Sequence, residues 1–104
     1  MMIARWIVKA QFGKQAQAIN LLEEWYAQIG SQTDVDLTTK RIISGSVGAD
    51  EAVIETEFEI EDLAELQGFF DKIGAIEIHK EWGQDMGNVV VSGSGVWQVF
   101  RVIN

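Results

Sequence analysis

The chain contains no cysteine and no proline, and His79 is its only histidine among 104 residues. Without cysteine it has no disulfide framework, no thiol nucleophile and no thiolate metal site, and we expect it to be cytoplasmic. Without proline, only glycine marks where helices end. One histidine leaves carboxylates as the other metal ligands, and these have no recognisable spacing, so we expect neither a metal nor a cofactor.

Basic residues are also scarce, because eight lysines and arginines stand against 16 acidic residues and the net charge is −8. Proteins that bind nucleic acid or anionic membranes need clustered basic side chains, and here they are scattered. No apolar stretch approaches the length of a membrane span. Arg5 and Lys9 interrupt the first residues, where a signal peptide would be apolar. We therefore expect neither nucleic acid nor a membrane as a partner.

Apolar residues recur at strand and helix periods along a chain long enough for one domain, residues 1–104. Alternation predicts strands over Met2–Gln11, Leu37–Gly45, Glu51–Ile60 and Val96–Ile103. Helical spacing predicts helices over Lys14–Ile29, Glu61–Ile73 and, more briefly, Ala75–Met86. The order strand, helix, strand, strand, helix, strand is typical of a ferredoxin-like α+β sandwich, here with an extra short helix before the last strand.

One face of such a sheet is left uncovered by helices. Alternation places Arg5 and Lys9 there, opposite Glu55, Glu57 and Glu59 of the third strand, and such cross-strand pairs stabilise a sheet by roughly 0.2–1 kcal/mol each. The apolar residues expected on this face are Ile3, Ile7, Trp97, Val99 and Ile103, with Arg101 among them. A second copy of the chain would cover this surface by a two-fold contact, so we expect a homodimer. A solvated face held by salt bridges remains the alternative.

The element order, the aromatic-rich first helix and the ending GVWQVFRVI give the whole chain a resemblance to the dimeric α+β barrel superfamily. That superfamily includes antibiotic-biosynthesis-monooxygenase-like domains, haem-degrading monooxygenases and stress-responsive barrel proteins. The resemblance implies a homodimeric α+β barrel whose two sheets meet face to face. It also implies a cleft in each subunit, between sheet and helices, for small hydrophobic ligands.

The chain departs from the family patterns that carry catalysis. Haem-degrading members use an asparagine on the first strand with a tryptophan and a histidine, whereas the first strand here offers Arg5 and Ile7. Stress-responsive members often carry a histidine on that strand, where this chain has Trp6. No catalytic set transfers to this sequence residue by residue.

His79 is the most reactive candidate, and it shares a helical stripe with Ala75, Trp82 and Met86. One interpretation is a neutral imidazole that faces a cleft and contacts a ligand, since its unperturbed pKa suits acid or base chemistry near neutral pH. The other is a partly buried histidine that hydrogen-bonds to backbone. Catalysis is a third reading, but the sequence names no partner for a base.

These observations predict a cleft that binds an apolar or amphipathic molecule, fatty-acid-like or aromatic. We expect His79 to be its polar anchor, with a wall made of Trp6, Trp25, Tyr26, Phe70 and Trp82. Arg5 or Arg101 would hold a carboxylate if the ligand lay at the dimer face. Two alternatives stay open: a cofactor-independent monooxygenase that acts on an electron-rich aromatic substrate, and a structural or interaction domain with an acidic docking face.

Overall fold

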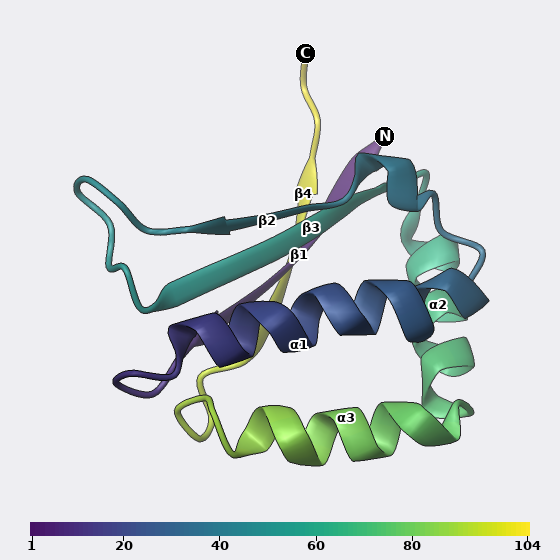
Figure 1. Cartoon of the computed structure of the whole chain (residues 1–104). Coiled ribbons are helices and arrows are strands. Elements are labelled where there is room, and N and C mark those ends of the chain that lie inside the picture. The colour runs from purple at the N-terminus through teal and green to yellow at the C-terminus, as the bar shows by residue number, and fades with distance from the viewer.

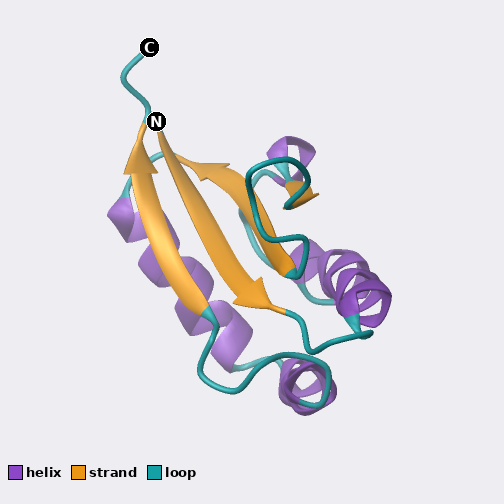
Figure 2. Cartoon of the chain, turned by 90° about the vertical axis from the view of Figure 1, so that its left-hand side faces the viewer, coloured by secondary structure: helices purple, strands orange, loops and turns teal.

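The computed structural model describes residues 1–104 as one antiparallel sheet with three helices on one side (Figures 1 and 2). The strands are β1 (Met2–Lys9), β2 (Arg41–Ser44), β3 (Val53–Ile60) and β4 (Val96–Arg101), in the sheet order β2-β3-β1-β4. The helices are α1 (Gln15–Gln28), α2 (Leu63–Gly74) and α3 (Glu77–Gly87). This is the predicted ferredoxin-like α+β order, with α3 as the extra helix before the last strand. No helix is long and apolar enough to cross a membrane.

The predicted elements shorten at several ends. The second strand begins only at Arg41, because Leu37–Thr39 form a 3-10 turn in which the Asp36 side chain accepts a hydrogen bond from the backbone of Thr38. Helix α2 begins after Asp62, whose carboxylate accepts from the backbone N–H of Glu65 at 2.9 Å. A side-chain cap of this kind satisfies a backbone donor that the first helical turn leaves free. Here polar caps, which the glycine pattern did not mark, set the boundaries.

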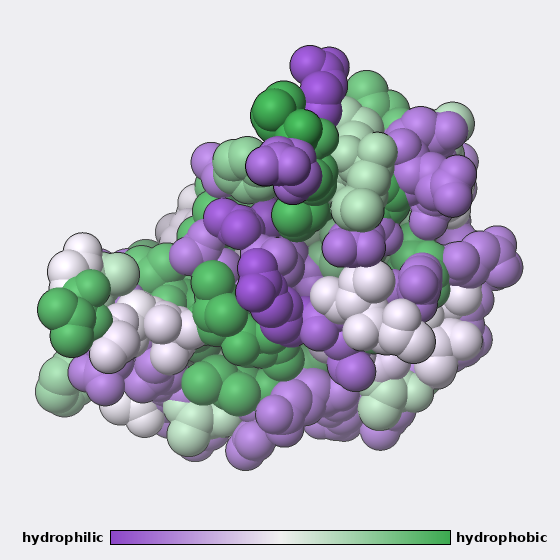
Figure 3. All heavy atoms as spheres, turned by 90° about the horizontal axis from the view of Figure 1, so that it is seen from above, coloured by the Kyte–Doolittle hydropathy of each residue, from purple (hydrophilic) through white to green (hydrophobic).

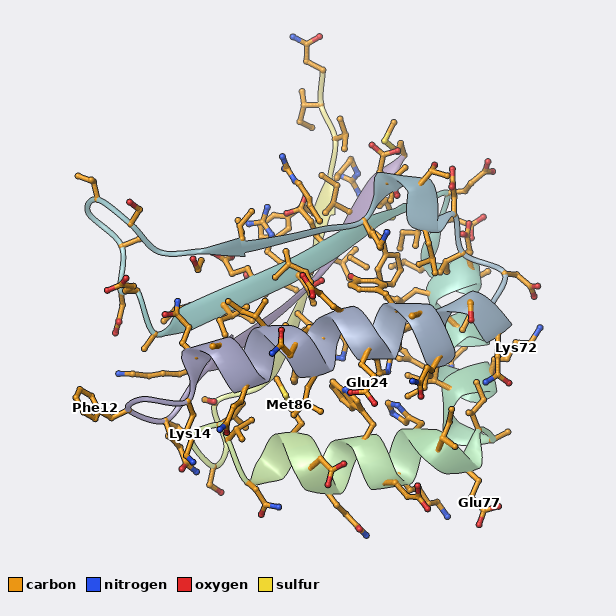
Figure 4. The ribbon with its side chains drawn as sticks, viewed as in Figure 1. Phe12, Lys14, Glu24, Lys72, Glu77 and Met86 are labelled. Carbon is orange, nitrogen blue, oxygen red and sulfur yellow. The ribbon has the colours of Figure 1, made fainter.

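The helices cover the sheet unequally. In Figure 1, α1 and α3 run beside each other below the sheet, while α2 crosses near one end of both. Helix α1 buries Ala18, Leu22, Trp25 and Tyr26, a stripe at helical spacing. On α3 only Met86 is buried, and Figure 4 shows it projecting toward α1. After α3, a bridge between Ala10 and Val90 ties the chain to the end of β1. Helix α3 therefore packs less deeply than α1, and the chain that follows it is fixed to the end of β1 by this bridge.

In β4, the residues that were predicted to lie on the open face of the sheet point toward the helices instead. Trp97 pairs with Trp6 and Arg101 pairs with Met2, so both lie on the helix side of the sheet. Trp97 packs edge-on against Phe69 and Phe70 of α2, with ring centroids 5.9 and 5.3 Å apart. Both faces of this strand carry apolar residues, so alternation alone did not choose between them, and the aromatic contacts did. The prediction that Trp97, Val99 and Arg101 lie on the open face was wrong, and Ile103 lies beyond the end of β4.

The open face instead gathers Ile3, Ile7, Ile43, Val96 and Phe100 around a charged centre. Figure 3 views this side of the molecule and shows green apolar side chains interspersed with purple polar ones. At the centre Glu57, only 4% exposed, accepts hydrogen bonds from Arg5 and from Arg41. The guanidinium of Arg5 also lies 4.9 Å from the ring centre of Phe100. The predicted pairing of Arg5 with the glutamates of the third strand is confirmed.

Glu57→Gln should destabilise the chain, because two guanidinium groups would lose their shared carboxylate. Burial acts to raise the pKa of Glu57, but hydrogen bonds from Arg5 and Arg41 outweigh it and hold the pKa below its usual value. We expect a loss of about 2 kcal/mol at pH 7, in line with hydrogen bonds to charged groups, measured by urea unfolding. The matched change Glu55→Gln removes only a 3.5 Å contact to Arg5 and should cost under about 1 kcal/mol.

The same pair of variants gives a pH test. A carboxyl group whose pKa is lowered by folding stabilises the native state above its unfolded pKa, and this contribution is lost as the pH falls through the folded pKa. The difference between wild type and Glu57→Gln should therefore shrink in acid below about pH 4. Equal losses for Glu55→Gln and Glu57→Gln at pH 7 would contradict the role given to Glu57.

Candidate functional site

A cavity of about 210 Å³ lies between the sheet and the three helices. All six residues predicted for the ligand wall and anchor line it: Trp6, Trp25, Tyr26, Phe70, His79 and Trp82. Five further residues line it that were not predicted: Leu22, Thr56, Phe58, Ile73 and Trp97. The structure thus brings the predicted side chains together from β1, α1, α2 and α3, and all four tryptophans of the chain meet there.

The cavity has a buried floor and a more exposed rim. Its floor comes from α1 and β3, where Tyr26 and Phe58 are 3% and 2% exposed. Its rim comes from the other elements, where Phe70, Trp82 and Trp97 are half-buried or exposed. Strand β4, which carries Trp97, lies at the edge of the sheet (Figure 2). The mouth of the cavity therefore lies among α2, α3 and β4.

Two indole hydrogen bonds join α1 and α3 in opposite directions. Trp25 on α1 donates its indole N–H to Nδ1 of His79 on α3, at 3.1 Å. Trp82 on α3 donates its indole N–H to the backbone carbonyl of Leu21 on α1, at 2.6 Å. The His79 and Trp82 rings stack with centroids 5.8 Å apart and an interplanar angle of 12°. His79 is therefore partly buried, but it accepts from an indole rather than bonding to backbone as one interpretation expected.

His79 is neutral in this arrangement. Burial lowers the pKa of its imidazole, because the charged form is poorly solvated among aromatic rings. Its Nδ1 accepts from Trp25, so the single proton of the neutral ring sits on Nε2. No protein atom accepts from Nε2, and no buried side-chain nitrogen or oxygen of the chain lacks a partner, so Nε2 is reachable from outside the protein.

At the floor of the cavity, the hydroxyl of Tyr26 is a further polar group. It hydrogen-bonds to the Thr56 hydroxyl, which donates in turn to the backbone carbonyl of Arg41 at 3.1 Å. This order makes Tyr26 the donor to Thr56. Burial raises the pKa of Tyr26, so its hydroxyl stays protonated near neutral pH. No Asp, Glu, Lys or Arg lines the cavity.

The two arginines expected as carboxylate anchors lie elsewhere. Arg5 is on the open face, as expected, but Glu57 and Glu55 occupy its guanidinium. Arg101 lies on the helix side at the far end of the sheet, in a shallow groove with Met2 and Asp62. Neither lines the aromatic cavity. Trp97 is one of the five lining residues that reasoning from the sequence missed, and the antiparallel pairing of β4 with β1 sets it opposite Trp6.

Comparison with known proteins identifies the fold. No family model matches the chain, and no curated protein sequence matches it significantly. A crystal structure of a candidate antibiotic biosynthesis monooxygenase from Caulobacter crescentus is 16% identical, with 99% of this chain and 90% of that chain covered and a TM-score of 0.71. A NIPSNAP domain protein from Burkholderia xenovorans is 7% identical, with 98% and 94% covered and a TM-score of 0.71.

A third solved structure is a dimeric ferredoxin-like protein of unknown function from a Jannaschia species. It is 11% identical, with 98% of this chain and 100% of that chain covered and a TM-score of 0.54.

His79 gives the cavity a pH test. Folding lowers its pKa, so the unfolded chain binds a proton at a pH where the native state does not, and stability falls as the pH drops below the unfolded value of about 6.5. We expect the urea concentration at the unfolding midpoint to decrease as the pH is lowered from 7 to 5.5. In the His79→Gln variant this decrease should be smaller. No other side chain has its ordinary pKa in this window. An unchanged slope in the variant would show that His79 is not the group responsible.

The solved structures agree with the architecture described above over nearly the whole chain, at identities that carry fold and not activity. The chain therefore has the ferredoxin-like α+β fold that its sequence pattern predicts.

Proposed function

We propose that this chain binds a small, uncharged aromatic molecule in the cavity among α1, α2, α3 and the sheet. The proposal rests on the residues that line the cavity: aromatic rings and a neutral histidine enclose an empty space of about 210 Å³. Side chains that line an unfilled apolar space lose packing partners on that side, which costs stability. A small domain has only about 5–15 kcal/mol of stability in total, so a void of this size needs a reason.

The volume limits the ligand. An engineered cavity of about 150 Å³ takes up benzene, whereas pockets for drug-sized ligands occupy roughly 300–1,000 Å³. At about 210 Å³ the cavity suits one or two fused rings. A long fatty acid fits the proposal less well, because its carboxylate would find no cation among the lining residues. Of the two ligand types that the sequence suggested, the aromatic one is favoured.

The geometry supports the two alternative functions less. A monooxygenase that activates an electron-rich substrate needs a base to ionise it, and His79 offers none, since Nδ1 accepts from Trp25 and Nε2 carries the proton. An acidic docking face is weakened by Glu57, whose charge two arginines already neutralise at the centre of the open face.

We propose further that the open face pairs with the same face of a second copy. Ile43, Val96 and Phe100 are 39%, 49% and 41% exposed there, although each is large and apolar. Monomeric proteins rarely leave such residues together in water. A two-fold contact buries each of these residues in both subunits. The Jannaschia protein with this fold is described as dimeric.

Tryptophan fluorescence tests the ligand proposal directly, because every tryptophan lines the cavity. We expect 2-naphthol to quench it with saturation, and decanoate to leave it unchanged. Ile73→Phe should weaken 2-naphthol binding at least roughly tenfold by filling space on the α2 side. The matched change Ile43→Phe lies on the open face and should leave binding intact. Unsaturable quenching, or equal affinity in a folded Ile73→Phe variant, would overturn the proposal.

Light scattering coupled to gel filtration tests the second copy. We expect a mass of twice the 11.6 kDa chain, and Phe100→Glu should reduce it to one chain by placing a charge in the contact. Val47→Glu is the control, because Val47 is 97% exposed in the loop between β2 and β3. A wild-type protein of single-chain mass at 100 µM, or a dimer that survives Phe100→Glu, would refute this pairing.

A further inference from the structure

The bond from Trp25 to His79 decides which hydrogen-bonding group His79, a residue that lines the cavity, has free. A neutral imidazole has one donor nitrogen and one acceptor nitrogen, and its neighbours determine which is which. An indole N–H can only donate, so the nitrogen that it meets must be the acceptor. The indole N–H of Trp25 donates to Nδ1 of His79 at 3.1 Å, and His79 consequently carries its proton on Nε2.

The surroundings hold the ring in this orientation. Stacking on Trp82 fixes the plane of the imidazole, and Trp82 is itself held to α1 through the carbonyl of Leu21. Trp25 is 8% exposed and packs edge-on against Tyr26 and Phe69, so its indole is fixed as well. A flip of the imidazole would break the indole bond and leave the Trp25 N–H without an acceptor in a largely buried position, which is costly.

We propose that Trp25 acts as a positioning residue that locks His79 in the Nε2–H form, and that the cavity thereby selects aromatic ligands bearing a carbonyl oxygen, such as aryl ketones or quinones. This inference rests on the proposed function and names its ligand class. The Nε2–H group has no protein acceptor and belongs to a side chain that lines the cavity. A carbonyl oxygen satisfies it, whereas a bare hydrocarbon leaves it without a partner once water is displaced.

The first test needs no ligand. His79 is the only histidine, so protein labelled with ¹⁵N-histidine gives one pair of ring-nitrogen signals, whose chemical shifts separate a protonated nitrogen from an unprotonated one. We expect a proton on Nε2 and none on Nδ1 at pH 7.5. Trp25→Phe, which keeps a ring but removes the donor, should give a mixture of the two forms. Trp97→Phe alters another lining indole that makes no bond to His79 and should leave the form unchanged.

The second test uses ligands that differ by one group. 1-Indanone and indane share a two-ring skeleton, and only the first carries a carbonyl oxygen. We expect His79→Phe to weaken 1-indanone roughly three- to tenfold, the range that one neutral hydrogen bond gives, and to change indane by less than about twofold. Trp25→Phe should lower the affinity for 1-indanone in the same direction. Comparing each ligand across variants removes the difference in hydrophobicity between the two.

The outcomes separate this inference from the proposed function. Binding of both ligands with equal responses to His79→Phe would overturn the carbonyl preference and leave the aromatic site standing. A wild-type spectrum with the proton on Nδ1 would overturn the lock by Trp25. Failure of both ligands to bind would overturn the aromatic site and the preference together. A loss confined to 1-indanone, with the Nε2–H form in the wild type, is the result that the structure predicts.

Discussion

The spacing between α1 and α3 depends on two indole hydrogen bonds that cross in opposite directions. Trp25 reaches from α1 to His79, and Trp82 reaches from α3 to the backbone of Leu21. Helix α3 fully buries only one residue, Met86, while its half-buried Trp82 packs against the core and against the rings of Trp6 and Trp25. The two bonds set the separation of the helices, and that separation leaves the cavity open. They also consume both the indole donors of this pair and one nitrogen of His79, which fixes the polar character of the site.

The two faces of the sheet differ in where they carry charge: the helix side forms the core, and the open side holds a buried ion-pair centre. On the helix side, the alternating residues of β1 and β3 are apolar apart from Thr56, and they close the core around Phe58 and Ile54, which are 2% and 0% exposed. On the open side, Glu57 is buried by two arginines, and apolar residues surround this charged centre. Charge is therefore kept away from the cavity and concentrated where a second copy is proposed to pack. The division follows from the period of two along β3, which sends Thr56 and Phe58 one way and Glu55 and Glu57 the other.

Much of this was predictable from local pattern. The alternation on β3 and the apolar stripe of α1 specified the fold, and helical spacing brought His79 and Trp82 to one side of α3. The orientation of β4 was not predictable in the same way, because both of its faces are apolar and only contacts between Trp97 and distant rings decide between them. The partner of His79 was also hidden, since Trp25 lies 54 residues away and nothing local links the two. Long-range contacts placed the cavity, and composition only supplied its rings.

The central claim is that the aromatic cavity is a binding site and not a packing defect. A crystal grown with bromobenzene tests it most directly, because bromine scatters anomalously and marks its own position. We expect one strong anomalous peak among Trp25, Phe58 and Trp82, with the protein backbone unchanged around it. A cavity without a peak at saturating bromobenzene, or peaks confined to the open face of the sheet, would contradict the claim.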